Sequence, residues 1–234
     1  MTSLALFDLD HTLLPLDSEY EWTRYLVRVG ALDAAEADDY NARWLEAYQA
    51  GTLDARAHAR FALGLLARHP RLRLEQWRAD FMREVIEPAL LPDAAALLAH
   101  HRHDGALCCI VTATCRFVAE PIAVRLGVRH LIAVEAVVDG SGEFTGELEG
   151  EPSFGAGKVV RVAQWLQAQN LRREAFDRIF FYSDSRNDIP LLEQVSDPVA
   201  VNPDASLLAL ARARGWPVLA LSTDAPAGAA LSAA

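Results

Sequence analysis

Short apolar runs alternate with helical segments along most of this chain of 234 residues. The expected strands cover 4–7, 106–111, 131–138, 143–148, 178–182, 199–201 and 218–221, and the expected helices cover 93–101, 117–126, 158–169 and 190–195. Strands that alternate with helices form a parallel sheet with helices on both faces. The pattern therefore predicts an α/β fold built on a doubly wound parallel sheet.

One long segment, 17–90, breaks this alternation. It carries apolar and aromatic residues at helical spacing and no convincing strand. We predict that it is a helical insertion placed after the first strand, and that 1–16 and 91–223 form the core. Its aromatic residues, among them Trp44 and Tyr48, are expected to be packing residues rather than ligand contacts. The Ala-rich end, 224–234, is expected to be disordered.

Charge and composition exclude several classes of partner. Lys and Arg total 22 and Asp and Glu total 32, so the net charge is 22 − 32 = −10. This acidity disfavours nucleic acid or an anionic membrane as the main partner, but a locally positive site still fits a small phosphorylated ligand. No apolar stretch approaches the ~20 residues needed to span a bilayer, and the first residues do not resemble a secretory signal. Cys108, Cys109 and Cys115 do not suggest a disulfide framework, so we expect a cytoplasmic protein.

Two carboxylates follow the first expected strand directly. Asp8 and Asp10 stand two positions apart, so in an extended chain their side chains point the same way. The carboxyl ends of parallel strands are where open α/β sheets bind ligands. Such a pair suggests a metal site, a nucleophile with a proton donor, or both. The alternative is a pair of acids that simply ends a strand in solvent.

Three further polar groups follow strands or open helices later in the chain. The second strand finishes in Thr112-Ala113-Thr114, at the expected start of a helix, which is a natural phosphate seat. Lys158 opens a helix after a glycine-rich turn, and the strand over 178–182 finishes in the segment 183–188, which holds Asp184 and Asp188. Each signal alone has an ordinary structural explanation. Together they converge on one crevice at the edge of the sheet.

In this order, the motifs resemble those of the haloacid dehalogenase-like hydrolase superfamily, and of its phosphoserine phosphatase-like subfamily in particular. Asp8-Leu9-Asp10-His11-Thr12 resembles the first motif, Thr112 the second, Lys158 the third, and the segment 183–188 the fourth. The helical insertion resembles the cap of that subfamily. The resemblance covers nearly the whole chain, and it implies an enzyme that hydrolyses a phosphate monoester.

The resemblance also implies a role for each motif residue. Asp8 would attack phosphorus and form an aspartyl phosphate, and Asp10 would protonate the leaving alcohol and then activate water. An Mg²⁺ ion would be held by Asp8, the Asp10 backbone carbonyl and Asp184. Halide leaving groups need no proton, so the acid at position 10 favours a phosphatase over a dehalogenase.

The remaining motif residues would bind or orient. Asp188 would orient the metal ligands from behind, and Lys158 would offset the negative charge of Asp8 and phosphate. Thr112 would bind a phosphoryl oxygen, with Ala113 and Asn187 as further substrate contacts.

The substrate is less constrained than the reaction. In phosphoserine phosphatases an acid seven residues after the general acid and an arginine of the cap bind the amino-acid end; Asp17 and Arg60 occupy comparable places here. Thr112-Ala113-Thr114 stands where that subfamily has Ser-Gly-Gly. Phosphoserine and an amino-alcohol phosphate such as histidinol phosphate therefore both remain candidates. A phosphotransferase and a non-catalytic phospho-ligand-binding protein are two further candidate functions, and the residues do not determine the oligomeric state.

A histidine cluster lies outside these motifs. His100, His101 and His103 fall at the end of an expected helix, before Asp104-Gly105. We expect a solvated helix end there, with a transition-metal site as the alternative.

Overall fold

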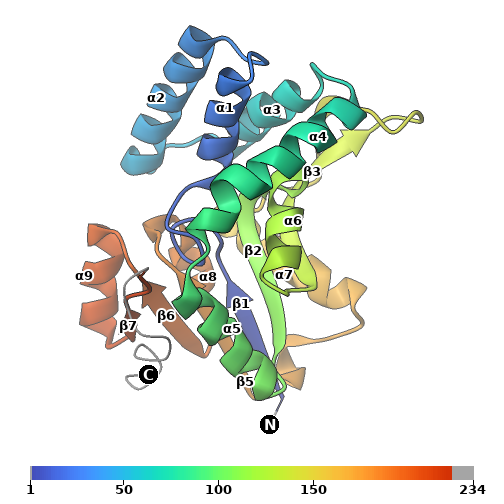
Figure 1. Cartoon of the computed structure of the whole chain (residues 1–234). Coiled ribbons are helices and arrows are strands. Elements are labelled where there is room, and N and C mark those ends of the chain that lie inside the picture. The colour runs from blue at the N-terminus through green and yellow to red at the C-terminus, as the bar shows by residue number, and fades with distance from the viewer. Residues whose placement is uncertain (1, 223–234) are drawn as a thin grey trace.

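A seven-stranded sheet forms the centre of the protein in the computed structural model, which describes residues 2–222. The predicted disordered tail, 224–234, lies outside the described residues. The strand order is β4-β3-β2-β1-β5-β6-β7, and β4 alone runs antiparallel to its neighbour among these strands (Figure 1). The strands are β1 (Ser3–Phe7), β2 (Leu107–Cys115), β3 (His130–Val138), β4 (Phe144–Glu149), β5 (Arg178–Ser183), β6 (Asp197–Val201) and β7 (Val218–Leu219).

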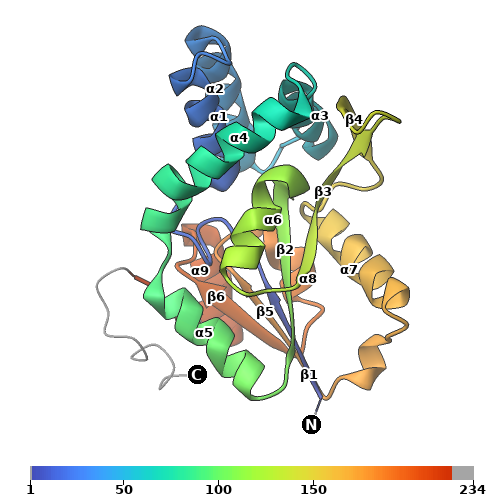
Figure 2. The ribbon, with the colours of Figure 1, turned by 45° about the vertical axis from the view of Figure 1, so that its right-hand side comes forward.

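Helices cover both faces of the sheet, each over its own apolar core. On one face lie α5 (Pro92–His103) and α6 (Arg116–Arg125). On the other lie α7 (Ala156–Ala168), α8 (Ile189–Leu192) and α9 (Ala205–Arg214) (Figure 2). This arrangement confirms the predicted doubly wound α/β class. Helix α9 was not predicted, although Asp204 caps its first turn and Gly215 its last.

The helical insertion lies between β1 and α5 and contains no strand in the described residues. It consists of α1 (Ser18–Arg28), α2 (Ala34–Ala50), α3 (Ala55–Leu66) and α4 (Arg71–Phe81), followed by a π-helical turn (Met82–Ile86) and a 3₁₀ turn (Glu87–Ala89). Asp17, Asp33 and Asp54 cap the first three helices by accepting backbone N–H bonds. The insertion sits over the carboxyl ends of the parallel strands (Figure 1).

The β3–β4 hairpin also contacts the insertion. Gly146 has a positive φ of 83°, and a Cβ there would lie 3.3 Å from the Ala67 side chain, so glycine lets strand β4 approach α3 closely. The backbone N–H of Arg71 donates to Glu143 at 2.6 Å. Insertion and core are therefore joined through the hairpin as well as through the chain connections (Figure 2).

The second strand is longer than the sequence predicted. Thr112 and Thr114 do not open a helix: β2 continues to Cys115, and α6 begins at Arg116. The pairing of β2 with β3 is regular to Val111 and resumes at Cys115 with a shift of register between them. Residues 112–114 thus leave the regular ladder just at the carboxyl edge of the sheet.

The prediction of a solvated histidine cluster is wrong for His101. This residue is 5% exposed, its Nε2 lies 2.7 Å from the Tyr182 hydroxyl, and its ring packs edge-on against Phe7. Helix α5 continues to His103, which turns His101 toward the sheet. Within residues 2–222 the histidines of this cluster are not part of a group of His, Cys, Asp or Glu side chains that could hold a metal ion, so the transition-metal alternative has no support there.

Candidate active site

The loop after β1 presents Asp8 and Asp10 at the carboxyl edge of the sheet. The N–H groups of Leu13 and Leu14 both donate to the Leu9 carbonyl, which closes the loop into a tight turn. His11 adopts the left-handed region, with φ of 56°, a conformation that costs a non-glycine residue about 1 kcal/mol. Strain of this kind is typical of functional loops.

Asp8 forms a buried ion pair. The Lys158 Nζ donates to Asp8 Oδ1 and to Asp188 Oδ2, each at 2.7 Å, and Lys158 is 3% exposed. Burial alone would lower the pKa of Lys158, but the carboxylates of Asp188 and Asp8 outweigh it and raise that pKa. Lys158 therefore keeps its charge and holds Asp8 in one orientation.

The helix that carries Lys158 is placed by a glycine. A Cβ on Gly157 would lie 2.2 Å from the Pro152 carbonyl oxygen, so only glycine permits this approach. Gly157 lies in the first turn of α7, directly before Lys158. Its close contact with Pro152 therefore fixes the position of the lysine.

Asp10 has a different environment from Asp8. Its Oδ1 accepts the Ser18 N–H at 2.8 Å, and its Oδ2 accepts the Thr114 hydroxyl at 2.5 Å. Burial raises the pKa of Asp10 despite these hydrogen bonds. Two carboxylates two residues apart thus differ: one is held by a cation, while burial favours a proton on the other.

Asp184 approaches Asp8 through a shared hydroxyl. Thr12 Oγ1 lies 3.3 Å from Asp8 Oδ2 and 3.1 Å from Asp184 Oδ1, and it accepts the Asp184 N–H at 3.1 Å. Burial and the nearby charges of Asp8 and Asp188 raise the pKa of Asp184 well above its ordinary value. Converging carboxylate oxygens that repel one another are a donor set suited to a hard divalent cation such as Mg²⁺.

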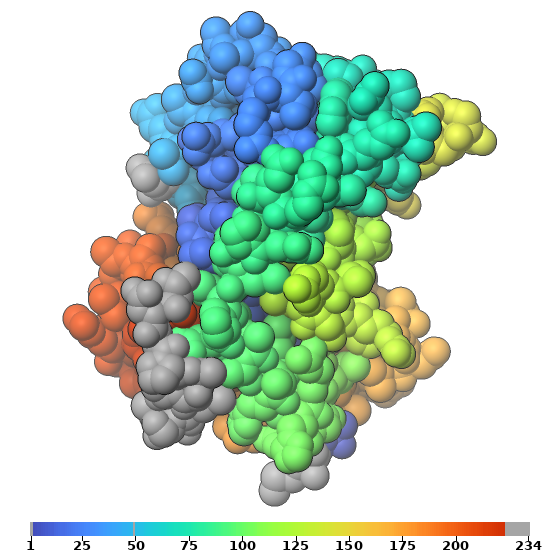
Figure 3. All heavy atoms as spheres, in the orientation of Figure 1, coloured from blue at the N-terminus to red at the C-terminus, as the bar shows by residue number. Residues whose placement is uncertain are grey.

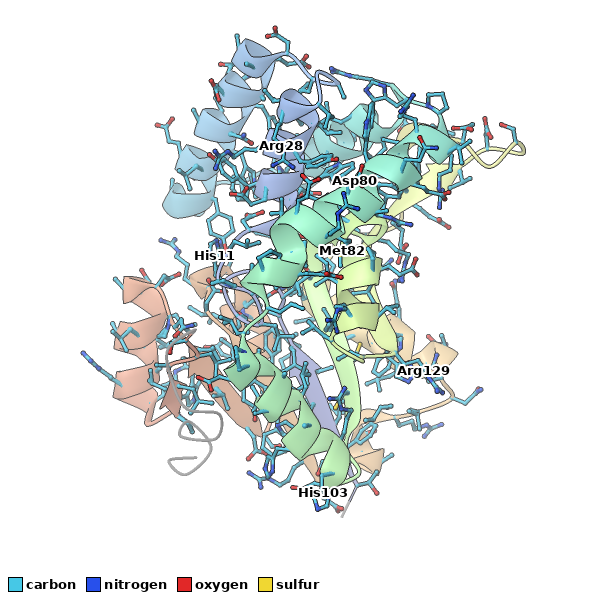
Figure 4. The ribbon with its side chains drawn as sticks, in the orientation of Figure 1. His11, Arg28, Asp80, Met82, His103 and Arg129 are labelled. Atoms are coloured by element: carbon cyan, nitrogen blue, oxygen red, sulfur yellow. The ribbon has the colours of Figure 1, made fainter. Side chains whose placement is uncertain are left out.

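A cavity of about 450 Å³ lies above these groups, between the core and the helical insertion. Figure 3 shows the insertion over the core. In Figure 4, His11, which lines the cavity, lies between the insertion and the core, whereas His103 lies at the end of the core farthest from the insertion. The cavity is large enough for a small metabolite.

The structure brings most of the predicted residues to this cavity. The predicted residues that line it are Asp8, Asp10, Asp17, Thr112, Ala113, Lys158, Asn187 and Asp188. Asp184 does not line the cavity but contacts the site through Thr12. Arg60 is exposed on α3 and does not line it either. Asp17 caps α1, with Oδ1 accepting the N–H groups of Glu19 and Tyr20.

Sequence reasoning missed the aromatic residues that helices α2 and α3 contribute to the cavity. Trp44 and Tyr48 of α2 were expected to be packing residues, yet both line it, as does His58 of α3. Tyr48 also donates its hydroxyl hydrogen to Ser185 Oγ of the core at 2.7 Å. Helical spacing looks the same for a core stripe and for a cavity wall, so the sequence held no signal that separates them.

A family model described as haloacid dehalogenase-like hydrolase matches residues 5–193, which is most of this chain. The chain belongs to this family, which confirms the resemblance found in its motifs.

The relatives narrow this class further. A protein named histidinol-phosphatase from Neisseria meningitidis is 39% identical over 94% of this chain and 99% of its own length. One named phosphoserine phosphatase from Mycobacterium tuberculosis is 32% identical over 93% of this chain and 70% of its own length. The family and these relatives confirm the predicted enzyme class, a hydrolase of the phosphatase type.

Solved structures give the same fold. A Bordetella pertussis protein of unknown function is 50% identical, with a TM-score of 0.88 over 93% of this chain and 98% of its own. A substrate-bound phosphoserine phosphatase superposes with a TM-score of 0.65 at 19% identity, over 89% of this chain and 90% of its own, and supports the fold alone. No helix within residues 2–222 is long and apolar enough to cross a membrane.

Proposed function

We propose that this protein is an Mg²⁺-dependent phosphomonoesterase that hydrolyses a small phosphorylated metabolite through an aspartyl phosphate on Asp8. The observation that carries the proposal is the contrast between Asp8, paired with Lys158 at 2.7 Å, and Asp10, which is hydrogen-bonded and has a raised pKa. Two nearby carboxylates with opposite environments divide the work of nucleophile and general acid.

The reaction has two balanced steps. Asp8 Oδ forms a bond to phosphorus while the ester P–O bond breaks, and Asp10 gives its proton to the departing alcohol oxygen. A water molecule then attacks phosphorus, its proton goes to Asp10, and the bond from phosphorus to Asp8 breaks to release inorganic phosphate. Lys158 offsets the negative charge that collects on Asp8 and the phosphoryl oxygens.

The same residues are the proposed donors for the metal ion and the phosphate. Asp8 and Asp184, with the backbone carbonyl of Asp10, would hold Mg²⁺, and Asp188 would keep Lys158 in place behind them. When bound there, Mg²⁺ would polarise the phosphoryl oxygens and offset their negative charge. Asn187 lines the cavity, and its buried Nδ2 has no hydrogen-bond partner within the described residues, so a phosphoryl oxygen would satisfy it.

Among the candidate substrates, an amino-alcohol phosphate such as histidinol phosphate fits the cavity better than phosphoserine. None of the described residues that line the cavity is an arginine, and Arg60 is exposed outside it. A substrate carboxylate would therefore lack the partner that the sequence predicted. We also propose a cytoplasmic location, because the three cysteines are buried and free.

The test is phosphate release from histidinol phosphate, phosphoserine and p-nitrophenyl phosphate, with Mg²⁺ and with EDTA. We expect release that EDTA abolishes and that histidinol phosphate supports best. Metal-independent release would contradict the proposed metal site. Transfer of phosphate to an added alcohol in place of water would identify a phosphotransferase.

A further inference from the structure

The insertion contributes an acidic and aromatic wall to the cavity. Three carboxylates of the wall lie at the start of α1 or just before it, and aromatic rings come from α1, α2 and α3. These wall residues are Asp17, Glu19, Tyr20, Glu21, Trp44, Tyr48 and His58. Lys158, the lysine that lines the same cavity, is already held by two carboxylates. The wall is thus suited to a group that carries positive charge.

Glu19 is the wall carboxylate with contacts to both the core and the helix α3 of the insertion. Its Oε1 accepts the Cys115 N–H at 3.3 Å, and its Oε2 lies 3.0 Å from His58 Nε2. The side chains of Glu19 and His58 are 13% and 12% exposed. One contact comes from the end of β2 and the other from α3, so core and insertion both fix this carboxylate.

His58 is itself held in place. Its ring stacks on those of Tyr40 and Trp44, with centroids 5.7 and 5.2 Å away, and its Nδ1 is hydrogen-bonded to the Tyr40 hydroxyl. Nε2 donates to Glu19, because a carboxylate only accepts. A carboxylate has room for about four hydrogen bonds. Glu19 interacts with the Cys115 N–H, the Cys115 thiol and His58 Nε2, which leaves capacity for a ligand.

The other two wall carboxylates have other partners. Asp17 caps α1 through the N–H groups of Glu19 and Tyr20. Glu21 accepts from Arg24 at 3.4 Å, and this pair lies at the surface. Glu19 differs from both in being fixed from the core and from α3 at once, beside the stacked rings of His58 and Trp44. A fixed carboxylate beside aromatic rings is an arrangement that binds cationic nitrogen.

We propose that Glu19 is the specificity-determining residue of this cavity, and that it accepts an N–H bond from a cationic amine in the alcohol part of the substrate. The proposal rests on the phosphomonoesterase function above. It selects phosphate monoesters of short amino alcohols and rejects those that also carry a carboxylate, because that carboxylate would face three acids. His58 is a positioning residue that acts through Glu19.

Esters that differ by one group test this assignment. O-phosphoethanolamine carries the amine alone, O-phosphoserine adds a carboxylate, and ethyl phosphate carries neither. Glu19→Gln keeps the shape and an acceptor for the Cys115 N–H, while Glu36→Gln makes the same change at an exposed position of the insertion that does not line the cavity. A charge-assisted hydrogen bond corresponds to a factor of about 10–100 in affinity.

We expect Glu19→Gln to lower kcat/KM for O-phosphoethanolamine by about 10–100-fold, mainly through KM, and to change ethyl phosphate by less than about twofold. Glu36→Gln should change both by less than about twofold, because its pair with Arg68 is exposed and lies outside the cavity. The wild type should prefer O-phosphoethanolamine to both other esters. An equal loss on the amine ester and on ethyl phosphate, or no preference by the wild type, would overturn the assignment.

Two controls keep the result interpretable. If Glu19→Gln does not fold, His58→Ala replaces it, with a rise in KM for the amine ester and unchanged kcat for ethyl phosphate expected. If no ester, including p-nitrophenyl phosphate, is hydrolysed, the proposed function fails by itself. Calorimetry with histidinol then tests the subsite alone: binding that Glu19→Gln weakens supports it, and no binding to the wild type overturns it.

Discussion

The two walls of the cavity are built in different ways. The core wall consists of groups at or near strand ends, where backbone geometry and a buried lysine shared by Asp8 and Asp188 fix each side chain. The insertion wall consists of side chains on separate helices, linked by rings and by the Glu19–His58 contact. We therefore expect the core wall to determine the reaction and the insertion wall to determine which substrate is bound.

Removal of the nucleophile tests the core wall with the largest expected effect. Asp8→Asn should lower kcat by more than about 10⁴-fold on every ester, because no carboxylate is left to attack phosphorus. Asp10→Asn should also abolish turnover. Phosphate release and circular dichroism measure activity and folding together, and full activity of folded Asp8→Asn would refute the mechanism.

Removing the buried Lys158 charge should lower the free energy of unfolding far more than removing an exposed charge of the insertion. Lys158→Met leaves Asp8 and Asp188 buried without their cation, so the free energy of unfolding should fall by about 3–5 kcal/mol. Arg56→Met, which removes an exposed pair with Glu151 at the insertion, should change it by less than about 1 kcal/mol. Urea unfolding measures both. Similar losses of unfolding free energy in the two variants would contradict the claim that the buried ion pairs stabilise the fold more than the exposed pair does.

His101 predicts how stability depends on pH at the far side of the core. Burial lowers the pKa of His101 from 6.5 to about 4. Below pH 6.5 the unfolded chain therefore takes up a proton that the folded chain binds only near pH 4. The free energy of unfolding should fall as the pH drops through this window, by about 3 kcal/mol in total from this residue.

His101→Asn is the control for that pH dependence. It keeps polar atoms near the Tyr182 hydroxyl but does not titrate. Urea unfolding at a series of pH values should give a flatter profile between pH 6.5 and 4 for the variant. An identical slope in both proteins would show that His101 does not contribute.

The contact between the walls should have the smallest effect. Tyr48→Phe removes the hydrogen bond to Ser185 and leaves the ring, so kcat/KM should fall by about 3–10-fold. Ser185 Oγ also accepts the Asn187 N–H, so the loss should be similar for amine and neutral esters, unlike that of Glu19→Gln. A loss confined to amine esters would instead show that Tyr48 contributes to recognition of the amine.

The sequence was informative about the core wall because position along a strand determines position at the sheet edge. Asp8, Asp10 and Thr112 could be placed together from the strand pattern alone, and the doubly wound class followed from the alternation of strands and helices. The insertion wall could not be placed, since Trp44, Tyr48 and His58 meet only through the packing of separate helices. The burial of His101 also depended on tertiary contacts, with Phe7 and Tyr182.

The most direct test of the central claim is the mass of the peptide that contains Asp8 after rapid acid quench. Asp10→Asn with p-nitrophenyl phosphate and Mg²⁺ is the sample, because p-nitrophenolate departs without a proton from Asp10, whereas loss of the base should slow hydrolysis of the intermediate. We expect the mass of one added phosphoryl group on that peptide and none in the Asp8→Asn, Asp10→Asn double variant. A phosphoryl group on another residue, or phosphate release by the double variant at the wild-type rate, would contradict Asp8 as the nucleophile.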